Sequence, residues 1–255
     1  MEFRTWGSEG RPLVLLLHAL GCHSGWWEWT APLLADEYRV IAPDFRGHGD
    51  SPRADQYRFQ DYAADVEHLL RQLKTDRCAL VGHSMGGYVA LTVAARGFFT
   101  PTAVVVADMK TSAPEQELAD LKAAAQKPSR TYPTLDDAVG RYRLAPPDHC
   151  VPPERLAAVA RDSYRQLPDG TWTEKFDRRA LAIEPLAPRD LVSRLKCPAL
   201  FLRGEHSVVM PAEPAVELAA AAGAQLLPMP GLYHHLPLEN PPAFADQVRA
   251  FLRAC

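Results

Sequence analysis

The sequence lacks several features that mark whole classes of protein. Its longest apolar runs, such as residues 12–17, are far shorter than the roughly 18 residues that span a bilayer. The opening residues MEFRTWGSEG show no charged-then-apolar leader and no small-residue cleavage site, so no secretory signal is expected. Five cysteines, an odd number at wide spacing, do not suggest a disulfide framework. These absences predict a cytoplasmic protein with no membrane partner.

The sequence also lacks a large excess of charge of either sign. The chain has 28 basic and 31 acidic residues, a net charge of −3, and its basic residues are scattered. A nucleic-acid partner is therefore not expected. No histidine pair has metal-ligand spacing such as H-E-x-x-H, so neither a metal nor another cofactor is expected. Composition does not bear on the oligomeric state.

What the chain does have is enough apolar sequence for one large core. It contains 255 residues, of which 47% are hydrophobic. Short apolar runs alternate with helical patterns, which is typical of βαβ units around a parallel sheet. Strands are expected at residues 13–17, 38–42, 77–81, 103–107, 199–202 and 225–229, with an antiparallel edge strand at 3–6. The last helix is expected behind Asn240 as N-cap and Pro241 as first helical residue.

One long stretch interrupts this alternation. Residues 110–189 contain no convincing core strand but three helical patterns, around 114–125, 134–143 and 153–164. A helical insertion between two strands of a parallel sheet indicates a lid over the strand ends. We therefore expect a core domain of residues 1–109 and 190–255, with a helical cap at 110–189.

The residues Gly82-His83-Ser84-Met85-Gly86 match the pattern G-x-S-x-G. This pattern places a serine on a sharp strand-to-helix turn, where flanking glycines let the neighbouring backbone approach closely. An apolar strand pattern precedes Ser84 and a helical pattern follows, which favours a nucleophile over a chance glycine-serine turn. A serine hydroxyl is a weak nucleophile at neutral pH, so it needs a base, an acid that orients the base, and donors for an oxyanion.

Together these residues resemble the α/β-hydrolase superfamily over nearly the whole chain. The matching segments are residues 17–21, 43–51, the turn at Ser84 and the histidine-containing segment 231–241. The resemblance implies an α/β fold with a mostly parallel sheet of eight strands, or one fewer, flanked by helices and carrying a helical cap. It also implies that the backbone N–H groups of Met85 and Leu20 form the oxyanion hole. The usual His-Gly of the first loop is His18-Ala19 here, which is a departure from the pattern.

The base is expected in the segment between the last strand and the last helix. His234 stands five residues before Glu239, just ahead of the helix start, and is the predicted base. His235 is the alternative. His83 is expected to pack within the core.

The acid that orients the base is not at the position where most members of the family carry it. Most members carry it in a G-x-x-D pattern after the strand at 199–202, but that aspartate position holds Ser207 here. Some members carry it one core strand earlier, where Asp108 directly follows five apolar residues. A buried carboxylate is costly unless it is paired or hydrogen-bonded. We therefore predict Asp108 as the acid, with Glu205 as the alternative.

These assignments predict that Ser84 attacks an acyl carbonyl, His234 acts as general base and Asp108 orients it. A serine nucleophile argues against epoxide hydrolases and haloalkane dehalogenases, which attack with a carboxylate. The expected substrate is a small uncharged carboxylic ester or lactone. The alternatives are another chemistry on this scaffold (a cofactor-free dioxygenase, a C–C hydrolase or a hydroxynitrile lyase) and a ligand receptor. Six aromatic residues are candidates to line an apolar pocket: Trp26, Trp27, Trp29, Tyr132, Tyr142 and Trp172.

Overall fold

A single seven-stranded sheet forms the centre of the computed structural model, which describes residues 1–255. Its strands are β1 (Phe3–Trp6), β2 (Leu13–Leu17), β3 (Arg39–Pro43), β4 (Cys78–His83), β5 (Ala103–Ala107), β9 (Ala199–Gly204) and β10 (Gln225–Met229). They lie in the order β1-β3-β2-β4-β5-β9-β10. Only β1 runs antiparallel to its neighbour. The predicted mostly parallel sheet is confirmed, with one strand fewer than eight.

Helices cover both faces of this sheet. The longer ones are α2 (Phe59–Gln72), α3 (Met85–Arg96), α8 (Ala212–Ala222) and α10 (Pro241–Arg253), with short α1 (Ala31–Leu34), η1 (Ser24–Trp27), α7 (Pro188–Val192) and α9 (Leu236–Glu239). Alternate residues of β2 enter two separate cores, Leu15 with α2 and α3, and Leu16 with α1 and α10. The Asn240 side chain caps α10 by accepting from the Ala243 N–H, as predicted. None of the helices has the length and apolar character needed to cross a membrane.

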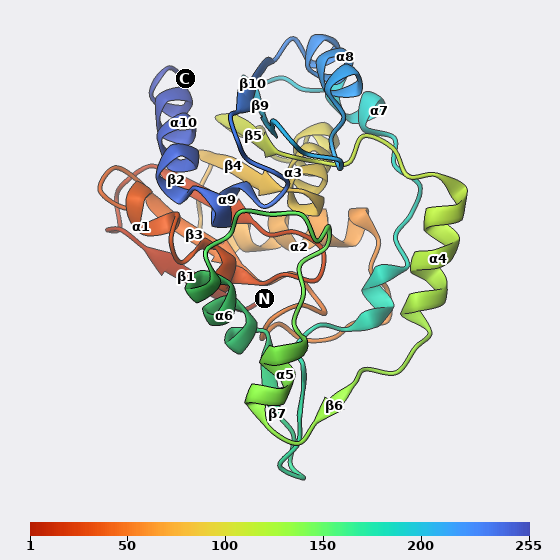
Figure 1. Cartoon of the computed structure of the whole chain (residues 1–255). Helices are drawn as coiled ribbons and strands as arrows, with labels where there is room; N and C mark the ends of the chain where they lie inside the picture. The colour runs from red at the N-terminus through yellow and green to blue at the C-terminus, as the bar shows by residue number, and fades with distance from the viewer.

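The insertion (residues 110–189) lies between β5 and β9. It contains α4 (Glu115–Ala125), β6 (Thr131–Tyr132), α5 (Leu135–Arg141), α6 (Pro153–Asp162), β7 (Tyr164–Gln166), β8 (Trp172–Glu174) and η2 (Arg178–Leu181). Its three longer helices match the three helical patterns. The small antiparallel sheet β6-β8-β7 was not predicted, because strands of two or three residues are too short to show alternation. Figure 1 shows this insertion in yellow-green to cyan, spreading away from α8 and α10.

The end of the insertion joins the core: α7 spans the predicted boundary at residue 189, and its Val192 packs in the core with α3. All five cysteines are free thiols.

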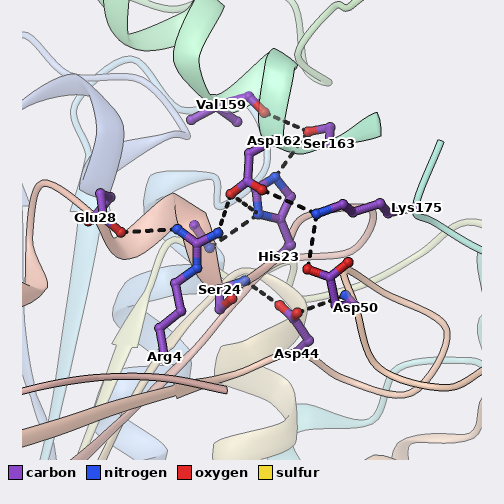
Figure 2. A network of polar contacts seen from close by, with 11 residues as sticks. Arg4, His23, Ser24, Glu28, Asp44, Asp50, Val159, Asp162, Ser163 and Lys175 are labelled. Atoms are coloured by element: carbon purple, nitrogen blue, oxygen red, sulfur yellow. Dashed lines mark hydrogen bonds and ion pairs between the residues drawn. The ribbon is translucent and has the colours of Figure 1, made fainter. Parts of the chain in front are cut away.

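A polar network ties the insertion to the core (Figure 2). Asp162, at the end of α6, pairs with Arg4 of β1 at 2.5 Å and with Lys175 at 3.3 Å. The adjacent Ser163 is 3.0 Å from Nε2 of buried His23, which lies in the loop after β2. Because Nδ1 of His23 accepts from the Gly25 N–H, Nε2 carries the proton and donates to Ser163. The insertion is thus attached here through charge and hydrogen bonds rather than through a large apolar interface.

Candidate active site

Ser84 occupies a strained turn between β4 and α3. Its φ of 53° and ψ of −118° lie in a region that residues with a side chain rarely adopt. The turn needs the two flanking glycines: a Cβ at Gly82 would lie 2.2 Å from the Gly86 carbonyl oxygen, and one at Gly86 would lie 2.1 Å from the Leu17 carbonyl oxygen. The Ser84 N–H donates to the Ala107 carbonyl at 2.8 Å, which fixes the turn against β5. This geometry is typical of a G-x-S-x-G turn, which presents its serine at the end of a central strand.

Asp108 and His234 meet in the core although 126 residues separate them. Nδ1 of His234 lies 2.7 Å from Oδ1 of Asp108. An ionised carboxylate only accepts, so Nδ1 carries the proton and donates, and Nε2 keeps its lone pair. His234 and Ser84 line the same cavity. The free nitrogen is therefore the one that can take a proton from a nucleophile.

The structure also explains how a carboxylate can be buried behind an apolar strand. Asp108 is fully buried, directly after β5. Besides His234, its carboxylate accepts from the Ser207 hydroxyl at 2.5 Å and from the Gly204 N–H at 2.8 Å. The Asp108 carboxylate thus accepts from three donors and is not left unpaired in the core. Ser207, noted in the sequence only as an unsuitable acid, thus lies where it supports the acid from the neighbouring strand end.

Glu205, the alternative acid, is placed elsewhere. Its side chain is 55% exposed, and its carboxylate accepts from the Gly231 N–H at 2.7 Å. No hydrogen bond joins Glu205 to His234. The structure therefore brings together Asp108 and His234 and leaves Glu205 on a surface turn.

Two further residues hold the backbone around His234. Nε2 of His83, a residue expected only to pack, lies 2.9 Å from the His234 carbonyl and donates to it. The Glu239 carboxylate accepts from the N–H groups of Tyr233 and His235, at 2.6 and 3.3 Å. Glu239 served only as a spacing marker in the sequence. Glu239 lies six residues after Tyr233, at the end of α9, and its two hydrogen bonds hold the turn that presents His234.

His235, the alternative base, turns toward the insertion. Its Nε2 donates to the Pro146 carbonyl at 3.0 Å. Burial, with His234 nearby, lowers the pKa of His235 to about 3, and burial also lowers the pKa of His83. Both rings therefore stay neutral near pH 7. Nitrogens of these three histidines lie within 4.8 Å of one another, and each ring uses one nitrogen in a hydrogen bond to the protein.

Two backbone N–H groups beside Ser84 are without acceptors. Met85 begins α3 and Leu20 lies in the loop after β2, and neither N–H donates to an acceptor in the protein. Both residues line the cavity that contains Ser84. Free N–H donors that line a cavity can stabilise an oxyanion, so both groups remain candidates for that role.

The first loop has His18-Ala19 in place of the usual His-Gly, and hydrogen bonds of the His18 side chain hold it in place. Nδ1 of His18 donates to the Ala19 carbonyl at 2.8 Å, and its Nε2 accepts from the Phe45 N–H at 3.0 Å. Asp44, directly after β3, accepts from the N–H groups of Ser24 and Asp50. These bonds fix the loop that carries Leu20.

The cavity has a volume of about 770 Å³ and 33 lining residues, of which 20 are hydrophobic. Of the six aromatic candidates, Trp26, Tyr132 and Tyr142 line it. The other three do not; Trp27, for example, is buried against Phe244 of α10. The core contributes Ser84 and His234 to this cavity, and the insertion contributes more than half of the lining residues.

Comparison with known proteins identifies the family. A model of the alpha/beta hydrolase family matches residues 14–247. The chain belongs to the α/β-hydrolase family. It is 29% identical over 254 residues to 2-(acetamidomethylene)succinate hydrolase of Mesorhizobium japonicum, covering 95% of this chain and 88% of that protein.

Solved structures of the family extend the likeness over the whole chain. A crystal structure of E-2-(acetamidomethylene)succinate hydrolase superposes with a TM-score of 0.85 at 25% identity, covering 98% of this chain and 94% of that one. The enol-lactonase from Burkholderia xenovorans gives a TM-score of 0.77 at 25% identity, covering 99% and 96%. Other curated relatives, epoxide hydrolases among them, are 38–45% identical over only 91–95 residues, about a quarter of their own length.

Proposed function

We propose that this member of the α/β-hydrolase family is a serine hydrolase that cleaves a carboxylic ester or lactone through an acyl-enzyme on Ser84. The observation that carries the proposal is the 2.7 Å contact between buried Asp108 and His234, because His234 lines the same cavity as Ser84 on its strained turn. The relatives named as a hydrolase and an enol-lactonase support hydrolysis over the other chemistries of the scaffold.

In this mechanism the Ser84 hydroxyl gives its proton to Nε2 of His234 as its oxygen attacks the acyl carbonyl. The negative charge that develops on the carbonyl oxygen is met by the N–H groups of Leu20 and Met85. Asp108 holds the imidazole through Nδ1 and stabilises the imidazolium. His234 then protonates the leaving alkoxide, and in the second half it activates the water that releases the acid.

A serine at the turn separates this chain from the epoxide hydrolases among its partial relatives, because those families attack with a carboxylate. Ser84 stands at the nucleophile position and no acid occupies the turn. We further propose that the insertion acts as a cap, since it forms a wall of the cavity that faces the core residues.

The test is a panel of esters and lactones assayed with the purified protein and with Ser84→Ala, both with and without oxygen. We expect hydrolysis that does not need oxygen and that Ser84→Ala abolishes. Turnover that requires oxygen, or that survives in Ser84→Ala, would overturn the proposal. Tight retention of an intact ester without turnover would indicate a receptor instead.

A further inference from the structure

The cavity wall that the insertion contributes carries an excess of positive charge. Five basic and two acidic residues line the cavity, although the whole chain has a net charge of −3. They are Lys110, Glu117, Arg130, Arg141, Arg143, Glu174 and Arg178. The two acidic residues are already matched: Glu117 pairs with Lys110, and Glu174 lies 3.7 Å from Arg178.

Three arginines remain without an acidic partner. Arg130, Arg141 and Arg143 have no carboxylate within 4.0 Å. One nitrogen of Arg143 donates to the carbonyls of Gly140 and Tyr142, at 3.0 and 2.6 Å. The guanidinium groups of Arg130 and Arg141 donate to no protein acceptor. Each guanidinium presents a fork of donors that matches an oxyanion.

These arginines come from a short stretch of the insertion. Arg130 directly precedes β6, Arg141 ends α5, and Arg143 follows it. The reacting groups, Ser84 and His234, come from the core sheet instead. Since 20 of the 33 lining residues are hydrophobic, the cavity suits a molecule with an apolar body and an anionic end.

We propose that Arg130, Arg141 and Arg143 form a subsite for the anionic group of the substrate, a carboxylate or a phosphate remote from the bond that Ser84 attacks. This inference rests on the proposed function and names its substrate class. It replaces the expected uncharged ester with an ester or lactone that carries a negative charge at its non-reacting end.

Matched 4-nitrophenyl esters test the proposal. One series carries a terminal methyl group, the second a terminal carboxylate at the same chain length, and the third a terminal phosphate. At low ionic strength we expect the better of the two anionic series to exceed the neutral series by about tenfold or more in kcat/KM. That preference should shrink as salt is added, because the three arginines are exposed and salt screens them. Equal kcat/KM for all three series would overturn the subsite, and the preferred anion shows which group it takes.

Substitution locates the effect. Arg130→Gln combined with Arg141→Gln should bring the ratio of anionic to neutral kcat/KM close to one. The matched control is Arg165→Gln, because Arg165 lies in the same insertion on β7, is exposed and does not line the cavity. If Arg165→Gln lowers the ratio as much as the double variant, the preference reflects overall charge and the subsite is wrong.

Binding separates this proposal from the proposed function. Ser84→Ala protein should bind the anionic ester about tenfold more tightly than the neutral ester in calorimetry, and the added double substitution should remove the difference. Anion preference in binding with no ester hydrolysis by the unaltered protein would keep the subsite and overturn the esterase. Ester hydrolysis through Ser84 without anion preference would keep the esterase and overturn the subsite.

Discussion

The central sheet and the insertion are stabilised by different kinds of interaction. Strands β2 and β5 are buried at every position, and two apolar clusters of 32 and 21 residues cover the sheet. In the insertion, α4 buries only Ala125 and α5 only Ala138. A cluster of seven buried residues joins part of the insertion to the first loop, and the polar network around Asp162 joins another part to β1.

This difference separates two tasks. The proposed reacting groups lie at the ends of strands in the densely packed sheet, where Ser84 and Asp108 both hold a positive φ. Such strain persists only where the surroundings fix it. The residues proposed to select the substrate lie in the thinly packed insertion, where a side chain can change without disturbing the core. Substitutions in the two regions should therefore fail in different ways.

The largest effect is expected at the two adjacent histidines. His234→Ala should lower kcat by about 10⁴–10⁶, since it removes the base that Asp108 orients. His235→Ala should keep most of the activity, because the His235 ring donates to Pro146 of the insertion. Steady-state kinetics on one good ester measure both. An inactive His235→Ala variant together with an active His234→Ala variant would contradict the assignment of His234 as the base.

The next effect separates the two candidate acids. Asp108→Asn keeps the shape but favours the wrong tautomer of His234, so the rate should fall by roughly 10³–10⁴ with the fold intact. Glu205→Gln should stay within about tenfold of the parent, a difference of at most about 1.4 kcal/mol. Rates at one pH, with circular dichroism to check folding, decide between them. A loss at Glu205 without one at Asp108 would reverse the assignment.

The sheet and the nucleophile turn could be predicted from the sequence because both have strong local signals. One run of five apolar residues ends directly before Asp108, and the glycines at positions 82 and 86 lie on either side of Ser84. The bonds to Ser207, His83 and Glu239 could not be predicted, because they join segments that only the folded sheet brings together. The same holds for the arginines of the insertion, whose shared cavity has no sequence pattern.

Substitutions of two leucines, one in the insertion and one in the sheet, test the difference between these two regions. Leu121→Trp, which narrows the cavity from α4, should shift the preference toward shorter acyl chains by about tenfold with little change in melting temperature. Leu80→Ala in β4, where Leu80 is fully buried, should cost about 2–5 kcal/mol of stability and leave the chain-length preference unchanged. Kinetics on a series of chain lengths and thermal melts give both answers. Melting that collapses in Leu121→Trp with unaltered preference would make the insertion part of the core.

The smallest effect concerns acid stability. Burial lowers the pKa of His18 to about 4, and those of His48 and His235 to about 3. Below about pH 6.5 these histidines bind protons in the unfolded chain, whereas in the folded protein they stay neutral until the pH nears their lowered pKa values. The free energy of unfolding should therefore be full above that pH and fall as pH drops toward 4, each ring adding a slope of up to about 1.4 kcal/mol per pH unit.

Denaturant unfolding between pH 7 and about pH 4.5 measures this slope. His48→Phe removes one buried imidazole among aromatic neighbours such as Phe45 and Tyr62, so it should flatten the slope. His68→Gln is the control, because His68 is exposed on α2. An unchanged slope in His48→Phe would show that this ring does not contribute.

The most direct test of the account is to find the covalent intermediate. The protein is mixed with a 4-nitrophenyl ester, quenched in acid and analysed by intact mass and peptide mapping, with an organophosphonate as a stable substitute for the ester. The account predicts one acyl group, or one phosphonyl group, on Ser84, and none on Ser84→Ala. Hydrolysis with the label on another residue, or an unchanged yield of label on Ser84→Ala, would contradict it.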